Sequence, residues 1–342
     1  MADDPLDATY VLPLRWLGDG PFDDLTAYLQ RLASRLEVIV VDGSAGERFA
    51  EHHRAWDSFA THLPPDPRFR FLNGKVNGVL TGIECAGNER VVVADDDVRY
   101  SWEELERVIA GLEHADVVRP QNYFSPLPWH ARWDTARILL NRALGGDFPG
   151  TLGVRRSTLL DAGGYDGDVL WENLELMRTV EAAGGLVLHD RGCLVRRLPP
   201  TARHFAGQRV RQAYDEWARP ARMAVNLAIL PVLVGLLARR RLAVVVVATA
   251  ATVATAEAGR RREGGVSRFP ASSSLLAPAW LAERAVCSWL ALARRATGGC
   301  PYAGTRFVRA ATPLRRLRAR YASRPGSGLR RPAPQSRAGR SR

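Results

Sequence analysis

Lysine is almost absent from this chain of 342 residues: Lys75 is the only one among 48 basic residues, and the other 47 are arginine. A genome rich in guanine and cytosine would produce such a bias. The two side chains are not interchangeable, because arginine presents a rigid planar fork whereas lysine carries a compact and mobile point charge. We therefore take Lys75 as a candidate for a position at which arginine cannot serve.

Cysteine is also scarce. The four cysteines, Cys85, Cys193, Cys287 and Cys300, lie far apart and form no CxxC pair and no cluster with histidine. This spacing excludes a zinc ribbon and a disulfide-stapled scaffold. The chain opens with MADDPLD, which is acidic and lacks the basic and apolar run of a secretory signal, so we expect a protein that is not secreted.

Acidic residues are absent from Arg294 to Arg342, a stretch that holds fourteen arginines. The other 34 basic and 36 acidic residues leave a net charge of about −2 on residues 1–293, so the formal charge of +12 resides in the tail. Cationic tails bind nucleic acid or the anionic cytoplasmic leaflet of a membrane. No basic patch interleaved with aromatic residues supports the first alternative, and we expect no nucleic-acid partner.

Apolar residues make up 46% of the chain and charged residues 25%, which is ordinary for a folded protein and excludes general disorder. Within residues 8–220, short apolar runs alternate with helical periods, a pattern typical of a parallel, doubly wound α/β sheet. The predicted strands are residues 8–14, 37–42, 68–73, 90–97 and 115–120, and the predicted helices are residues 23–36, 76–86 and 101–113. Ligands of such sheets bind beyond the carboxyl ends of the strands, where Asp42 and the run Asp95, Asp96, Asp97 fall.

The sequence changes character after residue 220. Residues 223–238 and 242–256 carry no charge, and Arg239, Arg240 and Arg241 separate them. Each run is shorter than the roughly 20 residues that span a bilayer comfortably. The second run has no polar face at all, which favours membrane embedding over a pair of buried core helices. We predict a catalytic domain at 1–220, two apolar membrane helices at 221–260, an amphipathic interfacial segment with Trp280 and Trp289 at 261–305, and a disordered Arg-rich tail at 306–342.

The three consecutive aspartates Asp95, Asp96 and Asp97 end a predicted buried strand, where they repel one another unless a cation is present. Mg²⁺ and Mn²⁺ prefer oxygen ligands and bind one or two carboxylates together with the phosphates of a substrate. The alternative is a solvated acidic turn. A further aspartate at an earlier strand end, Asp42, favours a site for a metal and a diphosphate, and the chain has no Gly-rich phosphate-binding loop to do this work instead.

An ordered set of motifs within about residues 8–220 resembles family-two glycosyltransferases of the A-type fold, in particular their membrane-associated bacterial members. The motifs are Asp42-Gly43-Ser44, NGKVNG at 73–78, VVVADDDV at 91–98, GTLGVRR at 150–156, GGYD at 163–166, WENLEL at 171–176 and QRVRQ at 208–212. The resemblance implies an enzyme that moves a sugar from a nucleotide-diphosphate sugar.

The resemblance also implies roles for single residues. Asp42 would hold the base or ribose of the nucleotide, and Lys75 would lie near the nucleotide. Asp95 would face the ribose or sugar and, together with Asp97, the Mg²⁺ or Mn²⁺ on the diphosphate. Arg209 and Arg211 would bind the diphosphate, the alternative being a solvated basic face of a helix.

Two positions depart from the family pattern. The acceptor motif usually reads Glu-Asp with the aspartate as the base, whereas this chain has Glu172-Asn173, and an amide does not accept that proton. We predict Glu172 as the catalytic base and Glu175, one turn along the same helix, as the reserve; the alternative is that both are acids of a helix surface. Gln212 stands where membrane-bound members have tryptophan, which argues against a processive polysaccharide synthase.

The combined hypothesis is an inverting, metal-assisted glycosyltransferase at the cytoplasmic side of the cell membrane, acting on a lipid-linked or envelope-glycan acceptor. Two alternatives stay open. A degenerate, glycosyltransferase-like membrane scaffold is motivated by Asn173. A nucleotidyltransferase would need a Gly-rich loop with a lysine, which residues 11–20 do not supply.

Overall fold

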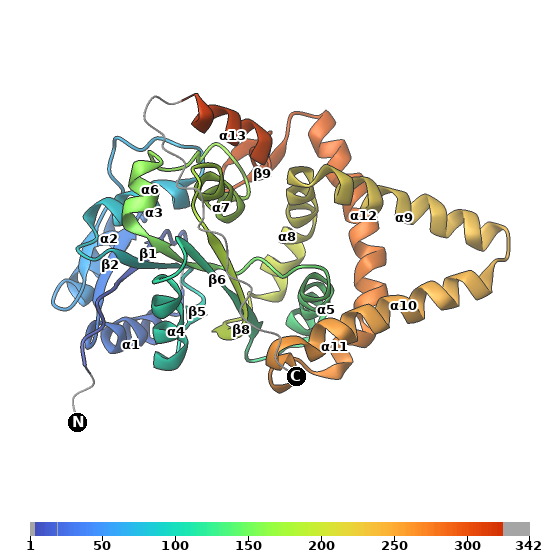
Figure 1. Cartoon of the computed structure of the whole chain (residues 1–342), viewed down its shortest axis with the longest axis horizontal. Helices are drawn as coiled ribbons and strands as arrows, with labels where there is room; N and C mark the ends of the chain where they lie inside the picture. The colour runs from blue at the N-terminus through green and yellow to red at the C-terminus, as the bar shows by residue number, and fades with distance from the viewer. Residues whose placement is uncertain (1–3, 19, 324–342) are drawn as a thin grey trace, which may run out of the picture.

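The computed structural model describes residues 4–18 and 20–323, which form an α/β body with a projecting pair of long helices (Figure 1). An eight-stranded sheet runs through the body in the order β3-β2-β1-β4-β7-β6-β8-β5. Its strands are β1 Thr9–Leu14, β2 Glu37–Asp42, β3 Thr61–Leu63, β4 Arg90–Ala94, β5 Val98–Arg99, β6 Val117–Phe124, β7 Thr151–Arg155 and β8 Val187–Arg197. Strands β3, β2, β1 and β4 are parallel, as are β6 and β8, whereas β7 and β5 run antiparallel to their neighbours. The predicted, mostly parallel α/β sheet is confirmed.

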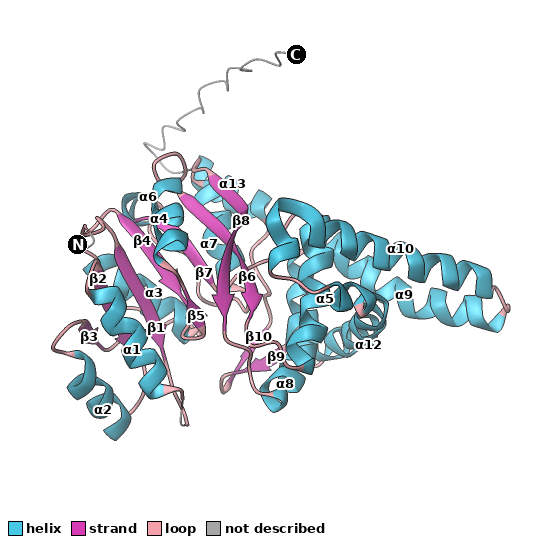
Figure 2. Cartoon of the chain, turned by 90° about the horizontal axis from the view of Figure 1, so that it is seen from below, coloured by secondary structure: helices cyan, strands magenta, loops and turns pink. Residues whose placement is uncertain are grey.

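Helices cover both faces of the sheet (Figure 2). One face packs against α1 (Phe22–Ala33), α2 (Glu47–Trp56) and α4 (Trp102–Gly111), and the other against α3 (Gly74–Cys85), α6 (Arg156–Asp161) and α7 (Glu172–Ala182). The β-branched runs of β2 and β4 lie between the two layers, where successive side chains alternate between two packed faces. Polar groups therefore gather only where these central strands end.

Residues 68–73, predicted as a strand, are irregular, and β3 lies earlier in the chain. The backbone amides of Phe71 and Leu72 donate to the side chains of Asn77 and Asp168, at 3.0 and 2.9 Å, instead of to a neighbouring strand. Asn73 then caps α3, because its side-chain oxygen accepts a hydrogen bond from the amide of Lys75 at 3.2 Å. These bonds to side chains take the place of strand pairing, and the cap sets Lys75 in the first turn of α3.

The C-terminal part of the chain is mainly helical. Its helices are α5 Trp129–Ala143 and α8 Ala202–Tyr214, followed by α9 Pro220–Ala238, α10 Leu242–Arg261, α11 Ala271–Leu275 and α12 Ala277–Ala296. Helices α9 and α10 project from the body and meet at a turn of three arginines (Figure 1). Both are long and apolar enough to cross a membrane, and residues 227–255 include no buried residue. We define residues 220–261 as the hairpin.

The base of the hairpin is fixed to the body. Helix α9 packs against α12, and α10 packs against α5. Gly259 allows the second contact, because a Cβ atom there would collide with the backbone carbonyl of Leu139. Trp280 of α12 is only 2% exposed and belongs to the core between α5, α10 and α12, so it cannot act as the predicted interfacial residue, whereas Trp289 is 44% exposed.

The segment that follows α12 returns to the sheet. It forms β9 (Cys300–Tyr302), β10 (Thr305–Phe307) and α13 (Leu314–Ala322). Leu317 and Tyr321, one turn apart on α13, bury their side chains near the end of α7. Residues 306–322 thus depart from the predicted disordered tail, because this apolar stripe gives them a surface to pack on; residues 324–342 lie outside the described residues.

Candidate active site

A cavity of about 430 Å³ opens where the central strands β1 and β4 end, the edge at which such sheets bind ligands. Its walls also come from the first turns of α3 and α7, the end of β8, and α8. The charged residues that line it are Arg15, Lys75, Asp95, Asp96, Asp97, Asp134, Arg137, Glu172, Arg197 and Arg211. Carboxylates and cations therefore share one polar cleft, which suits a ligand that carries both phosphates and hydroxyl groups.

Lys75 joins two of the predicted acids. Its Nζ atom lies 2.5 Å from Asp95 Oδ1 and 2.8 Å from Glu172 Oε1. Burial by itself would lower the pKa of Lys75, but the two carboxylates outweigh it and hold that pKa above the usual value. The lysine is thus a permanent cation of the cavity, and it brings residues 75, 95 and 172 together as predicted.

Arg197, the last residue of β8, joins the next two acids. Its Nη2 atom lies 3.2 Å from Asp95 Oδ2, and its Nε atom donates to Asp97 Oδ2 at 2.8 Å. Burial raises the pKa of Asp97 to about 6 in spite of the opposing pull of Arg197. Asp96 is held separately, because its Oδ2 atom accepts a hydrogen bond of 2.6 Å from the indole of Trp16.

Asp95 and Asp97 offer the ligand type that a divalent cation requires. Carboxylate oxygens are the hard donors that Mg²⁺ and Mn²⁺ prefer. Asp97 Oδ1 is buried and has no hydrogen-bond partner among the described residues, whereas the other three oxygens of the pair already contact Lys75 or Arg197. The donor set therefore fits a divalent cation, with Asp97 as the first ligand and Asp95 as the second.

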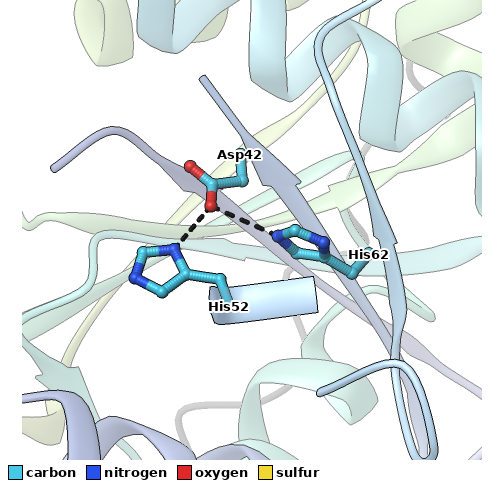
Figure 3. A group of neighbouring side chains, drawn as sticks. All are labelled: Asp42, His52 and His62. Atoms are coloured by element: carbon cyan, nitrogen blue, oxygen red, sulfur yellow. Dashed lines mark hydrogen bonds and ion pairs between the residues drawn. The ribbon is translucent and has the colours of Figure 1, made fainter. Parts of the chain in front are cut away.

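Asp42 lies apart from both charged groups, inside a buried cluster with two histidines (Figure 3). Its Oδ2 atom is 2.6 Å from His52 Nδ1 and 3.2 Å from His62 Nε2, and its Oδ1 atom accepts from the amide of Ser44 at 2.8 Å. Two ligands of one zinc ion, each about 2.0–2.2 Å from it, would stand about 3.3 Å apart in tetrahedral geometry, so the 2.6 Å contact is a hydrogen bond and not a shared metal.

This cluster leaves the Asp42 carboxylate without an exposed surface, since the side chain is 0% exposed. Burial raises its pKa, but the hydrogen bonds from His62, Ser44 and His52 lower it to about 2. The predicted contact of Asp42 with a base or ribose is therefore not made by this carboxylate as it stands. Its hydrogen bond shapes the turn at Gly43 and Ser44 that follows β2.

The two arginines predicted to bind diphosphate have different surroundings. Arg209 is buried and paired with Asp134 at 3.0 Å and with Glu283 at 2.8 Å, so it joins α8 to α5 and α12. Arg211 lines the cavity, lies 4.6 Å from the centre of the Tyr302 ring, and has an Nε atom without a hydrogen-bond partner in the described part of the chain. Of the two arginines, Arg211 lines the cleft, whereas Arg209 is engaged in buried ion pairs outside it.

We expect the variants Arg209→Gln and Arg211→Gln to separate stability from binding. Arg209→Gln leaves two carboxylates short of their buried partner, and we expect the free energy of unfolding to fall by about 3–5 kcal/mol. Arg211→Gln removes a cation from the cavity without breaking an ion pair, so nucleotide affinity should fall while the melting temperature stays within a few degrees. Thermal unfolding and nucleotide titration of both variants check this, and the reverse pattern would contradict it.

Of the two candidate bases, only Glu172 reaches the cavity. It begins α7 and is 8% exposed, with one oxygen on Lys75. Glu175 is fully buried, and its Oε2 atom accepts a hydrogen bond of 2.6 Å from the amide of Thr312. Burial raises the pKa of Glu175. Asn173 donates to the carbonyl of Pro149 at 3.1 Å, so the amide has a structural partner of its own.

Sequence reasoning missed Arg15, Asp134 and Arg137 of the cleft, and also two residues with a direct bearing on its chemistry. Arg197 is one. The other is Asp215, in a short 3-10 helix (Asp215–Ala218), which lines an adjoining cavity of about 160 Å³ together with Glu172, Arg197 and Arg211. Burial raises the pKa of Asp215 to about 6 against the pull of Arg211. Neither residue belongs to a recognisable motif, and one arginine among 47 gives no signal.

Comparison with known proteins agrees with this geometry. The chain is an enzyme, a glycosyltransferase that uses a nucleotide sugar. Residues 23–161, which include β2, Lys75 and the three aspartates, match the family model described as "Glycosyl transferase family 2". The predicted resemblance to this family is thereby supported over these residues. No curated protein matches the chain.

Solved structures match the chain at low identity. The mannosyltransferase PcManGT from Pyrobaculum calidifontis, in complex with GDP-Man and Mn²⁺, is 17% identical with a TM-score of 0.47 over 84% of this chain and 88% of that one. GalNAc-T7 with UDP, GalNAc and Mn²⁺ is 13% identical with a TM-score of 0.37 over 57% of this chain and 44% of that one. Likeness of this degree carries no argument about the site.

Proposed function

We propose that this glycosyltransferase transfers a sugar, with inversion and with a divalent metal, from a nucleotide-diphosphate sugar to a lipid-linked or envelope-glycan acceptor at the cytoplasmic face of a membrane. One observation carries the proposal. Lys75, Asp95, Asp97, Glu172 and Arg211, which are far apart in the sequence, line a single cavity at the carboxyl edge of the sheet.

The donor would occupy two adjoining cavities. A second cavity, of about 410 Å³, shares Lys75, Asp96 and Tyr302 with the first and extends to Val41 and Gly43 at the end of β2. This side suits the nucleoside, because backbone groups and the Tyr302 ring line it. The diphosphate would then lie toward Arg211, which lines the first cavity and whose guanidinium makes, within the residues that the structure describes, only two long hydrogen bonds, of 3.4 Å each, to Gln208 and to the carbonyl of Leu170. A phosphate would offer it shorter, charge-assisted hydrogen bonds.

Glu172 would act at the acceptor. The carboxylate takes the proton of the acceptor hydroxyl while the oxygen of that hydroxyl forms a bond to the anomeric carbon. The bond between that carbon and the diphosphate oxygen breaks on the opposite side, and its electron pair leaves with the nucleotide diphosphate. A divalent cation, held by Asp97 and Asp95, would supply neutralisation of charge on the leaving diphosphate. Lys75, fixed between Asp95 and Glu172, links the donor side of the cleft to the base.

The hairpin supports attachment to a membrane. Its exposed part is apolar on all sides, which is costly in water, and exposed apolar patches of this size mark interaction surfaces. Trp289 of α12 lies beside α9, since its indole donates to the carbonyl of Leu227 at 3.1 Å, and it would sit at the interface. Attachment of this kind would keep the enzyme close to lipid-linked or envelope acceptors, which is why we propose that class.

We expect the hairpin to cross the bilayer rather than re-enter it. The 16 charge-free residues 223–238 extend about 24 Å as a helix, close to a thin bilayer once arginines at both ends snorkel. An Arg240→Cys variant in an otherwise cysteine-free chain should then react with an impermeant thiol reagent in intact cells. Reaction only after the cells are opened would instead support a re-entrant pair that keeps Arg239, Arg240 and Arg241 near the cytosolic headgroups. Release of the protein by high salt alone would contradict both forms.

A thermal-shift panel of GDP, UDP and their sugar conjugates, with and without Mn²⁺, tests the donor part of the proposal. A ligand that binds only the folded state stabilises the protein and so raises its melting temperature. At a free ligand concentration of a hundred times the dissociation constant, the free energy of unfolding rises by about 2.7 kcal/mol. We expect one nucleotide class to do so, and more strongly with Mn²⁺. The scaffold alternative, favoured by Asn173 in the place of an acid, predicts binding without turnover, so hydrolysis of the nucleotide sugar would exclude it.

A further inference from the structure

The five charged side chains at the centre of the cleft form one unbroken series of ion pairs. In order, they are Glu172, Lys75, Asp95, Arg197 and Asp97, with nitrogen–oxygen distances of 2.8, 2.5, 3.2 and 2.8 Å. Negative and positive groups alternate along the series. The two aspartates that fit a metal are therefore already bridged by a cation of the protein.

The fold delivers Arg197 to this position. Strand β5 pairs with β8 so that Val98, next to Asp97, lies opposite Arg197. The carbonyl of Asp97 also accepts a hydrogen bond of 2.7 Å from the amide of Leu198. With the two backbones tied at this point, the guanidinium has only a short distance to reach the carboxylates.

A glycine makes room for the contact. Gly150, the last residue before β7, faces both Asp95 and Arg197, and a Cβ atom there would collide with the Asp95 carboxylate and lie 3.0 Å from Arg197 Nη1. The amide of Gly150 donates to Asn122 Oδ1 at 2.8 Å, and its carbonyl accepts from the amide of Asp95 at 2.8 Å. The ion pair thus sits in a space that the backbone holds open.

The charges of the series explain what the bridge does. Three carboxylates and two cations give a net charge of −1, which is nearly balanced without any metal. A divalent cation would change the net charge of the series to +1. The diphosphate of a nucleotide-diphosphate sugar carries two negative charges and would return the net charge to −1. If Arg197 were neutral, the three carboxylates and Lys75 would carry a net charge of −2 and would attract a divalent cation on their own.

We propose that Arg197 is a resident counter-cation that takes the place of the metal on Asp95 and Asp97 when no donor is bound, so that metal and nucleotide diphosphate bind only together. The inference rests on the proposed function. When the pair of ligands enters, the guanidinium leaves Asp97 for the incoming diphosphate, with which it forms the planar two-point contact that arginine favours. Arg197 is therefore a positioning residue for the metal and a binding residue for the donor.

Calorimetric titration of Mn²⁺ into the full-length, detergent-solubilised protein tests this directly, without an activity assay. We compare the wild type with Arg197→Gln, which removes the charge, and Arg197→Lys, which keeps it. Arg196→Gln is the matched control, because Arg196 is exposed on the same strand and donates to the carbonyl of Ser125 instead of to a carboxylate. Each titration is run alone and with saturating GDP or UDP, and thermal unfolding confirms that each variant is folded.

Without nucleotide, we expect Arg197→Gln to bind Mn²⁺ at least tenfold more tightly than the wild type, Arg197→Lys and Arg196→Gln. With nucleotide, the difference should shrink or reverse, because the lost guanidinium no longer helps to bind the diphosphate. Equal Mn²⁺ affinity of wild type and Arg197→Gln, with binding still enhanced by nucleotide, would overturn the inference and leave the proposed function intact. Absence of Mn²⁺ binding in all four proteins, even with nucleotide, would overturn the metal-assisted function and the inference together.

Discussion

Glu172→Gln is expected to reduce turnover by roughly two to four orders of magnitude while donor binding is preserved. Glutamine keeps the size of the side chain and its hydrogen bond to Lys75, but its amide has no affinity for the acceptor proton. The affinity for donor should change little, because Lys75 keeps its contact with Asp95 at 2.5 Å. Single-turnover kinetics with a nucleotide sugar and an acceptor extract measure the loss.

Glu175→Gln is the control for this variant. The residue lies on the same helix, and its Oε2 atom serves only the amide of Thr312, a role that a glutamine oxygen also fills. We expect turnover within a fewfold of the wild type. If Glu175→Gln is inactive and Glu172→Gln is active, the base has been assigned to the wrong carboxylate, and Asp215 would be the next residue to replace.

Asp97→Asn is expected to abolish the Mn²⁺-dependent part of nucleotide-diphosphate binding. Asp97 holds the one carboxylate oxygen of the pair that has no partner among the described residues, and an amide is a much weaker ligand for a hard cation. The fold should persist, because Arg197 keeps its ion pair with Asp95 and the carbonyl of Asp97 keeps its hydrogen bond from the amide of Leu198. The readout is the melting-temperature shift by GDP or UDP with Mn²⁺, relative to the same nucleotide without it.

Asp96→Asn is the matched control, since Asp96 also lines the cavity but accepts a hydrogen bond from Trp16 that asparagine can accept too. The metal-dependent shift should survive in this variant. A metal-dependent shift that persists in Asp97→Asn would remove Asp97 from the metal assignment. We expect Arg197→Gln to have the opposite effect on metal affinity to Asp97→Asn, because it should strengthen metal binding in the absence of nucleotide.

The sequence predicts those parts of the site that follow from strand ends and helix starts. Asp95 and Asp97 follow a run of β-branched residues, and Lys75 and Glu172 begin helices, so the topology of a parallel sheet brings them to one edge. Glu172 and Glu175 look equivalent in the sequence. Only packing separates them, because the returning segment at Thr312 covers Glu175 and leaves Glu172 open.

Other features depend on pairing between distant segments, which periodicity does not show. Arg197 reaches the acids because β8 pairs antiparallel with the two-residue strand β5. Asp42 lost its predicted access because α2 and β3 place His52 and His62 over its carboxylate. A pattern of residues along one strand contains no information about such partners. The sequence therefore predicts that Asp42 contacts the nucleotide, whereas in the structure its carboxylate is occupied by hydrogen bonds to His52 and His62.

The return of the C-terminal segment has a consequence for how the enzyme is made. Tyr302 lines both cavities that we propose for the donor. The amides of Leu170 and Trp171, just ahead of the proposed base, donate to the carbonyls of Arg309 and Ala310 at 3.0 and 2.8 Å. The ribosome synthesises these residues only after the hairpin. The nascent chain therefore lacks the complete proposed donor site until its apolar helices have left the ribosome. If the hairpin enters a membrane as we propose, we expect activity to appear only after that step.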